Sequence, residues 1–158
     1  MIIFTEQEAK AILDKVIALS KADECTATLA GSIDGNIRFA LNNVSTSGMV
    51  TNAELAVQVA FGKRVGTASI NEFDDASLER VVRRAEDLAR LAPENPEFMP
   101  AIGKQDYKAS PTFSTSTAAI NPEFRAQVAA DSITPCRGNG LIAAGFLEDS
   151  RGFIAIAN

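Results

Sequence analysis

The sequence predicts an α+β fold in which an antiparallel sheet of four to five strands packs against two helices, followed by a linker and a partial second α+β unit. Two observations carry this prediction. Apolar residues alternate with polar ones through 24–41 and 54–70, which is the period of half-buried strands. The flanking segments 5–22 and 78–92 instead repeat their apolar residues at the three-and-four spacing of an amphipathic helix. The order helix, strands, helix leaves one sheet face open to a second layer, a ligand or another chain.

Both predicted helices carry start signals. Thr5 and Glu8 form a T-x-x-E capping box ahead of the first apolar stripe. Asp74 or Asp75 stands where the second helix needs an N-cap, and Pro93 stops that helix. Two adjacent carboxylates also suit acid–base chemistry or a metal ion, but their place at a helix start favours capping.

Turn signals divide the predicted sheet. The Asp-Gly pair 34–35 predicts a tight hairpin turn, and the Gly-Lys pair 62–63 predicts a second one. The segment 44–52, rich in Ser and Thr, predicts a weaker strand whose two faces are both wet. The run 62–66 resembles part of a phosphate loop, but it lies between two strands rather than between a strand and a helix, which favours the hairpin.

Three segments of different composition predict the domain organisation. Residues 1–95 contain the helices and the sheet described above. Residues 96–120 are rich in Pro, Ser and Thr, which cannot bury enough apolar surface to pack, and therefore predict a linker. Residues 121–158 predict the start of a second domain with one helix and a hairpin. Because its last apolar strand coincides with the last residues of the sequence, we expect this second unit to be truncated.

The predicted second unit begins at residues 121–122, where Asn forms an N-cap and Pro takes the first helical position. Pro135 is expected to end or kink this helix. Two strands should follow, 141–147 and 153–157, joined by a turn at residues 149–150.

The 158 residues include no histidine. Histidine is the commonest metal ligand and the usual general base, so its absence excludes zinc-type, Ser/His and Cys/His mechanisms within this chain.

The formal charge of −5 argues against a surface that binds nucleic acid. Cys25 and Cys136 are too far apart for a metal motif and indicate buried thiols of a reducing compartment. No apolar run is long enough to span a bilayer, so the expected location is cytoplasmic.

The candidate binding residues lie on the strand face opposite the apolar residues. Arg38 is on that face, and Asn42 and Asn43 follow at its end. A polar strand surface with Arg and amide side chains suits an extended peptide or a protein partner, while an ordinary solvent-exposed surface is the alternative. The arginines of the second helix are interleaved with acidic residues at four-residue spacing, which favours a solvated helix face over an anion site.

Several short motifs occur in a definite order along the chain. They are Arg38-Phe39-Ala40-Leu41-Asn42-Asn43, Leu55-Ala56-Val57-Gln58-Val59, Gly62 to Ala68, Asn71, the helix 78–92 with Pro93-Glu94-Asn95-Pro96, Asn121-Pro122-Glu123, Gly140 to Gly145 and Ile156-Ala157-Asn158. In this order and spacing they resemble the TldD/PmbA family, whose members are also named modulators of DNA gyrase. The resemblance covers nearly the whole chain, which is similar to the N-terminal portion of a typical member.

The resemblance implies a metal-dependent peptidase system that processes peptides and is usually built as a dimer. TldD-like members carry zinc at an H-E-x-x-x-H motif in a region far C-terminal to anything present here, whereas PmbA-like members lack a functional metal site. No position of this sequence matches that motif, so no catalytic, cofactor-binding or metal-binding residue is assigned in this chain. Zinc is implied only for a full-length parent of the TldD type, and whether the parent is an enzyme stays open.

Two functions are therefore expected as alternatives. In the favoured one, the chain is the N-terminal part of a TldD/PmbA-type protein, noncatalytic alone, that contributes to a peptide cleft or dimer interface. Its partners would be a peptide substrate or a second family subunit in a homo- or heterodimer, with no direct nucleic-acid or membrane contact. The alternative is a free-standing peptide- or protein-binding module without a hydrolytic parent. We also expect the isolated chain to self-associate through the edges of its last strand and of 44–52.

Overall fold

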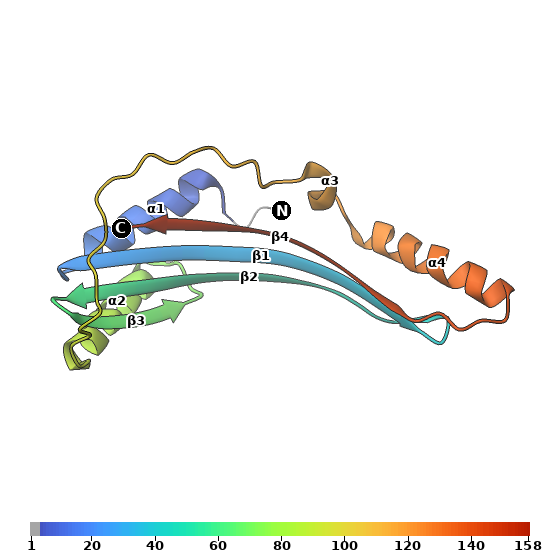
Figure 1. Cartoon of the computed structure of the whole chain (residues 1–158), viewed down its shortest axis with the longest axis horizontal. Helices are drawn as coiled ribbons and strands as arrows, with labels where there is room; N and C mark the ends of the chain where they lie inside the picture. Colours follow the sequence, from blue (N-terminus) through green and yellow to red (C-terminus); the bar gives the residue numbers. More distant parts are fainter. Residues whose placement is uncertain (1–3) are drawn as a thin grey trace. The chain divides into compact units, whose positions relative to one another are not determined.

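The computed structural model describes residues 4–158 and confirms the predicted α+β fold (Figure 1). Its strands form one four-stranded antiparallel sheet with the order β3-β2-β1-β4. The elements in chain order are α1 (Glu6–Leu19), β1 (Glu24–Ala40), β2 (Asn43–Phe61), β3 (Arg64–Ile70), α2 (Asp75–Leu91), α3 (Thr115–Ala118), α4 (Pro122–Gly138) and β4 (Gly145–Ala157).

The described residues group into two compact units. The first unit comprises the chain through Gly31 together with Ala53–Ala109 and Phe153–Asn158, and the second comprises Ser32–Asn52 and Ser110–Gly152. Strands β1, β2 and β4 each contribute residues to both units. The proposed domain organisation, with 1–95, a linker at 96–120 and a second domain at 121–158, stays a prediction.

The helix starts of the first unit follow the predicted caps. The hydroxyl of Thr5 accepts a hydrogen bond from the Glu8 amide at 3.2 Å, and the Glu8 carboxylate accepts one from the Thr5 amide at 2.8 Å, which is a complete capping box. Asp74 caps α2 by accepting from the Ser77 amide at 3.1 Å. Hydrogen bonds from the Thr5 amide and hydroxyl hold the pKa of the Glu8 carboxyl below its ordinary value, and those from the Ser77 hydroxyl and amide do the same for the pKa of Asp74.

One apolar core fills the first unit. Its buried residues come from α1, α2 and the near halves of β1, β2 and β3: Ala9, Leu13, Val16, Ala27, Leu29, Leu55, Val57, Val59, Ala68, Leu78, Val81, Val82, Ala85 and Ala89. Strand β3 and helix α2 approach closely at Gly66, where a Cβ atom would lie 2.3 Å from the Ala85 carbonyl oxygen and 2.3 Å from the Ala89 nitrogen. Glycine is therefore required at this contact.

The strands are longer than the turn signals predicted. The prediction of a turn at residues 34–35 is wrong, because β1 continues through them to Ala40. The chain instead turns at Leu41 and Asn42, which have φ of 50° and 60°. The weak strand 44–52 is a part of β2 rather than a separate element. The second predicted hairpin is confirmed, since Gly62 has φ of 57° and Phe61 pairs with Arg64.

In the second unit, α4 begins as predicted but passes its proline. Asn121 caps the helix by accepting from the Phe124 amide at 2.8 Å, and a proline takes the first turn. Of the two outcomes expected at Pro135, an end of the helix is wrong, because α4 continues to Gly138, and a kink stays a prediction. The prediction of a turn at residues 149–150 is also wrong, because β4 continues through these residues without a break. Five apolar residues form the core here: Ile37, Phe39, Ala129, Ile133 and Ala143.

Candidate functional site

The candidate site is the face of the second unit's strands that α4 does not cover, which we call the open face. Along β1, Ile37 and Phe39 are buried in the cluster with residues of α4, whereas Arg38 between them is exposed. Since successive side chains point to opposite sides of a strand, Asp34 shares the open side with Arg38. Phe146 and Ser150 of β4 contact these two residues and complete the open face.

Arg38 lies where the sequence placed it, on the polar side of its strand. Its guanidinium carbon stands 5.4 Å from the centre of the Phe146 ring, within the range of a cation–π interaction. The Phe146 side chain is 53% exposed. The pair therefore offers a cation and an aromatic surface to the same solvent-facing side of the sheet.

Asp34 is a fixed anion on the same face. Its carboxylate accepts hydrogen bonds from the Ser150 hydroxyl at 2.5 Å and from the Ser32 hydroxyl at 2.7 Å. These two bonds, first that of Ser150 and then that of Ser32, hold the pKa of the Asp34 carboxyl below its ordinary value. Asp34 is consequently ionised at neutral pH, and its position is set by two strands.

The two asparagines lie at the turn after β1, and their amides bond within the chain. The Asn42 side-chain oxygen accepts from the Ala143 amide at 2.7 Å, and its nitrogen donates to the Leu141 carbonyl at 2.9 Å. The Asn43 nitrogen donates to the Leu41 carbonyl at 2.9 Å. The side-chain amides of both asparagines thus bond within the chain, whereas Arg38 is exposed on the open face. Binding by any of the three stays a prediction.

Sequence reasoning missed Arg125, which is the most buried charged residue of the second unit at 2% exposure. One terminal nitrogen of its guanidinium lies 2.6 Å from the Asp149 carboxylate. A Cβ atom at Gly35 would lie 2.2 Å from the same nitrogen, so the guanidinium rests directly on the β1 backbone. Arg125 stands four residues before Ala129 and eight before Ile133, on the inner stripe of α4, and this spacing was a readable signal of burial.

Arg125 contacts the strands from the side opposite the open face. It contacts Gly35 and Asp149, and each of these is the neighbour in sequence of an open-face residue, Asp34 and Ser150. Its Nε atom is buried and has no hydrogen-bond partner among the described residues, so the ion pair is incompletely satisfied. The open face itself presents a guanidinium, a carboxylate, a hydroxyl and an aromatic ring.

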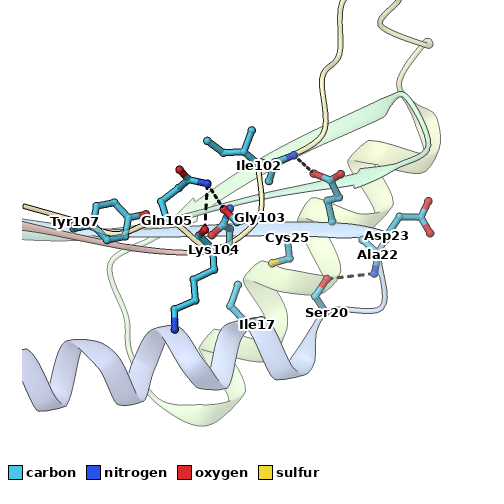
Figure 2. A pocket seen from close by; sticks show the side chains of 13 residues that line it. Ile17, Ser20, Ala22, Asp23, Cys25, Ile102, Gly103, Lys104, Gln105 and Tyr107 are labelled. Carbon is cyan, nitrogen blue, oxygen red and sulfur yellow. Dashed lines mark hydrogen bonds between the residues drawn. The ribbon is translucent and has the colours of Figure 1, made fainter.

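One pocket of the first unit contains a cysteine. Figure 2 shows this cleft of about 780 Å³, where the segment 101–107 passes the end of α1 and the start of β1. Burial raises the pKa of the Cys25 thiol, a hydrogen bond to Ser20 lowers it, and the charge of Glu86 raises it, with a net rise. Cys25 is therefore a protonated thiol at neutral pH, which is a weak nucleophile. It and Cys136 are half-buried free cysteines.

Two kinds of feature are absent from the described part of the chain, a cluster of metal ligands and a membrane-spanning helix. Within residues 4–158, no group of three or more His, Cys, Asp or Glu side chains could hold a metal ion. No helix in this range has the length and apolar character needed to cross a membrane.

A protein-family model matches one segment of this chain. Residues 30–89 match the family model described as PmbA/TldA metallopeptidase domain 1. This match confirms the predicted resemblance to the TldD/PmbA family over that segment. No curated protein sequence matches the chain.

Solved structures share the fold over nearly the whole chain. TldE from Thermococcus kodakarensis matches with a TM-score of 0.75 and 14% identity, over 94% of this chain and 34% of its own. A Bacteroides thetaiotaomicron protein named as a putative modulator of DNA gyrase matches with a TM-score of 0.71 and 14% identity, over 97% of this chain and 37% of its own. A Thermotoga maritima protein with a similar name matches with a TM-score of 0.70 and 12% identity, over 93% of this chain and 35% of its own. The chain thus spans about a third of the length of these proteins.

Proposed function

We propose that this chain is a noncatalytic part of a TldD/PmbA-type peptide-processing protein and that its open face forms one wall of a peptide cleft. The observation that carries the proposal is the open face itself, where the exposed Arg38 and Phe146 lie on the same side of the sheet as the fixed anion Asp34. Arg38 and Asp34 also lie inside the segment that matches the first domain of a metallopeptidase family. The sequence has no histidine to supply a zinc ligand, so hydrolysis in such a system would use residues of another region.

An extended peptide matches the chemistry of this face. Its carboxylates and carbonyl oxygens are acceptors for the Arg38 guanidinium, and its apolar side chains can pack on the Phe146 ring. Basic side chains of the peptide would be attracted by the ionised Asp34. Because these groups are fixed on strands rather than on loops, little ordering entropy would be lost on binding.

The proposal is tested with the whole chain and a mixture of unstructured peptides, such as a fluorescein-labelled casein digest. Binding is measured by fluorescence anisotropy, and cleavage by mass spectrometry with and without added zinc. We expect binding without cleavage. Arg38→Glu should weaken binding about tenfold, equivalent to ~1.4 kcal/mol. The matched control is Arg84→Glu, which makes the same charge change at an exposed position of α2.

Two outcomes would contradict the proposal. Cleavage by the chain alone, abolished by a chelator, would show that it is catalytic. A dimer that Arg38→Glu dissociates and Arg84→Glu does not would make the open face a subunit interface instead of a peptide wall. That distinction is read directly from sedimentation of the three proteins across a range of concentrations.

A further inference from the structure

We propose a second recognition site in the first unit, in which the outer edge of β4 at Phe153–Ala157 binds an extended basic peptide as a fifth strand of the sheet. This site is separate from the open face, and it names both the mode of binding and the charge of the partner. Three features of the first unit point to it: the free edge of β4, a groove beside that edge, and the acidic rim of the groove.

The edge of β4 is built to accept another strand. β4 is the last strand in the sheet order, so the described residues provide no strand beyond it. An edge strand carries a row of unpaired N–H and C=O groups, and proteins commonly protect such edges with Pro, Lys or charged residues. The stretch Phe-Ile-Ala-Ile-Ala at 153–157 has none of these. Ile154 and Ile156 are instead 67% and 62% exposed.

A groove of about 490 Å³ runs between this edge and the N-terminal half of α1. Its apolar lining includes the buried residues Ala9 and Leu13 of α1 and the half-buried Phe153 of β4. Phe4 also lines it and packs edge-on against Phe153, with ring centres 6.0 Å apart. In a strand every second side chain points to the same side, so an added strand would direct alternate side chains into this groove. Small or β-branched apolar side chains suit its size.

The charges around the groove select a basic occupant. Its charged residues are Glu6, Lys10 and Asp14 of α1. Lys10 is paired with Asp14 at 2.6 Å, and Glu6 has no ion-pair partner among the described residues. The rim is therefore net negative, on a chain whose formal charge is −5. A second copy of the chain would bring the same acidic rim, whereas a peptide with Lys or Arg near its ends complements it.

The test uses the full chain and four fluorescent seven-residue peptides. The parent peptide is Lys-Val-Thr-Val-Thr-Val-Lys, and its matched control has Glu in place of both Lys. The other two carry backbone N-methyl groups, one on the odd-numbered amides and one on the even-numbered amides. Only one set of amides faces β4 in a paired strand, so we expect one methylated peptide to bind like the parent and the other to lose binding. The acidic peptide should bind at least about tenfold more weakly.

Two variants of the chain locate the site. Glu6→Lys should reverse the preference between the basic and acidic peptides. Glu123→Lys, the same change in the first turn of α4, should leave the preference unchanged. Equal effects of both methylation patterns would show that binding is not strand pairing and would overturn the proposal. So would a concentration-dependent dimer that excludes the peptide, because the edge would then serve a second copy. Cleavage by the chain would contradict only its noncatalytic role and would leave this inference standing.

Discussion

The two units are stabilised in different ways although they share three strands. The first unit has fourteen buried apolar residues in its described core, contributed by two helices and three strands. The second unit has five and adds a buried arginine, Arg125, with its partner Asp149. Burial of apolar surface is nondirectional, whereas an ion pair or hydrogen bond fixes particular atoms relative to one another.

This difference explains where a recognition surface can form. In the second unit the polar contacts reach both sides of the sheet: Arg125 on the α4 side, and Asp34 with Ser150 on the open side. The small core alone would leave the strand register weakly specified, because residues 43–52 of β2 are all exposed. The polar contacts therefore stabilise the second unit and place its candidate site at the same time. Substitutions that break them should separate the behaviour of the two units.

The largest effect is expected from Asp149→Ala. It leaves the Arg125 guanidinium buried without its carboxylate, which should cost about 3–5 kcal/mol in the free energy of unfolding. Urea denaturation measures this loss. Hydrogen exchange should show that amides of α4 lose protection while those of α2 keep theirs, because only the second unit contains the pair.

The control for this prediction replaces both partners, as Arg125→Met with Asp149→Leu. Buried ion pairs replaced by apolar side chains of similar size are often neutral, and the unpartnered Nε of Arg125 makes this pair an incomplete one. We expect the double variant to be more stable than Asp149→Ala. If it is equally unstable, the ion pair stabilises the second unit more than the apolar contacts that replace it, and the two units differ more strongly in what stabilises them. If Asp149→Ala costs under ~1 kcal/mol, the polar contacts do not stabilise the second unit.

A matched pair of glycine substitutions compares the two units directly. At Gly66 a Cβ atom would meet backbone atoms of α2, which cannot move without separating the helix from the sheet. At Gly35 it would meet the end of the Arg125 side chain, which can shift. We expect Gly66→Ala to cost ~3 kcal/mol or more and Gly35→Ala to cost less. Thermal unfolding of both variants measures the difference, and the reverse order would contradict this account of the two contacts.

The parts of the fold that depend on neighbouring residues could be predicted from the sequence. The caps at Thr5, Asp74 and Asn121 are satisfied by groups three residues away, so the sequence contains both partners. The alternating strands and the hairpin at residues 62–63 are local in the same sense. Family resemblance added what local patterns do not, namely a relation to peptidase proteins.

The parts that depend on distant residues were not predictable in this way. The Asp-Gly pair 34–35 has the chemistry of a turn, yet its Asp bonds to Ser150 and its Gly accommodates Arg125. The local turn preference was overridden by contacts made about ninety residues or more along the chain. Asn42 likewise bonds to Ala143, 101 residues away, so its place in the fold could not be read from its position after a strand.

The first unit also contains one buried charge, and it supplies the smallest expected effect. Glu86 is 1% exposed and accepts hydrogen bonds from the Lys21 amide at 2.7 Å and from Arg83 at 2.8 Å. It thereby joins α2 to the end of α1, whose Leu19 carbonyl accepts from the same Arg83 at 2.9 Å. The predicted ion pair of Glu86 with Arg90 is present at 3.7 Å, but the carboxylate is buried rather than solvated.

The pH dependence of this contact should distinguish it from the surface ion pairs. Burial raises the pKa of the Glu86 carboxyl, but the Lys21 and Arg83 hydrogen bonds and the arginine charges together lower it below its ordinary value of 4.5. A carboxyl whose pKa is lowered on folding stabilises the protein above its unfolded pKa and loses that contribution as the pH falls through the folded value. Glu86→Gln should therefore lower the free energy of unfolding by about 1.5–3 kcal/mol at pH 7 and by much less at pH 3.

The control Glu79→Gln removes an exposed ion pair with Arg83 at 3.8 Å and should lower the free energy of unfolding by only a few tenths of a kcal/mol at either pH. Urea titrations of the three proteins at both pH values test this, and a cost for Glu86→Gln that stays constant between pH 7 and pH 3 would show that the charge of Glu86 does not join the two helices.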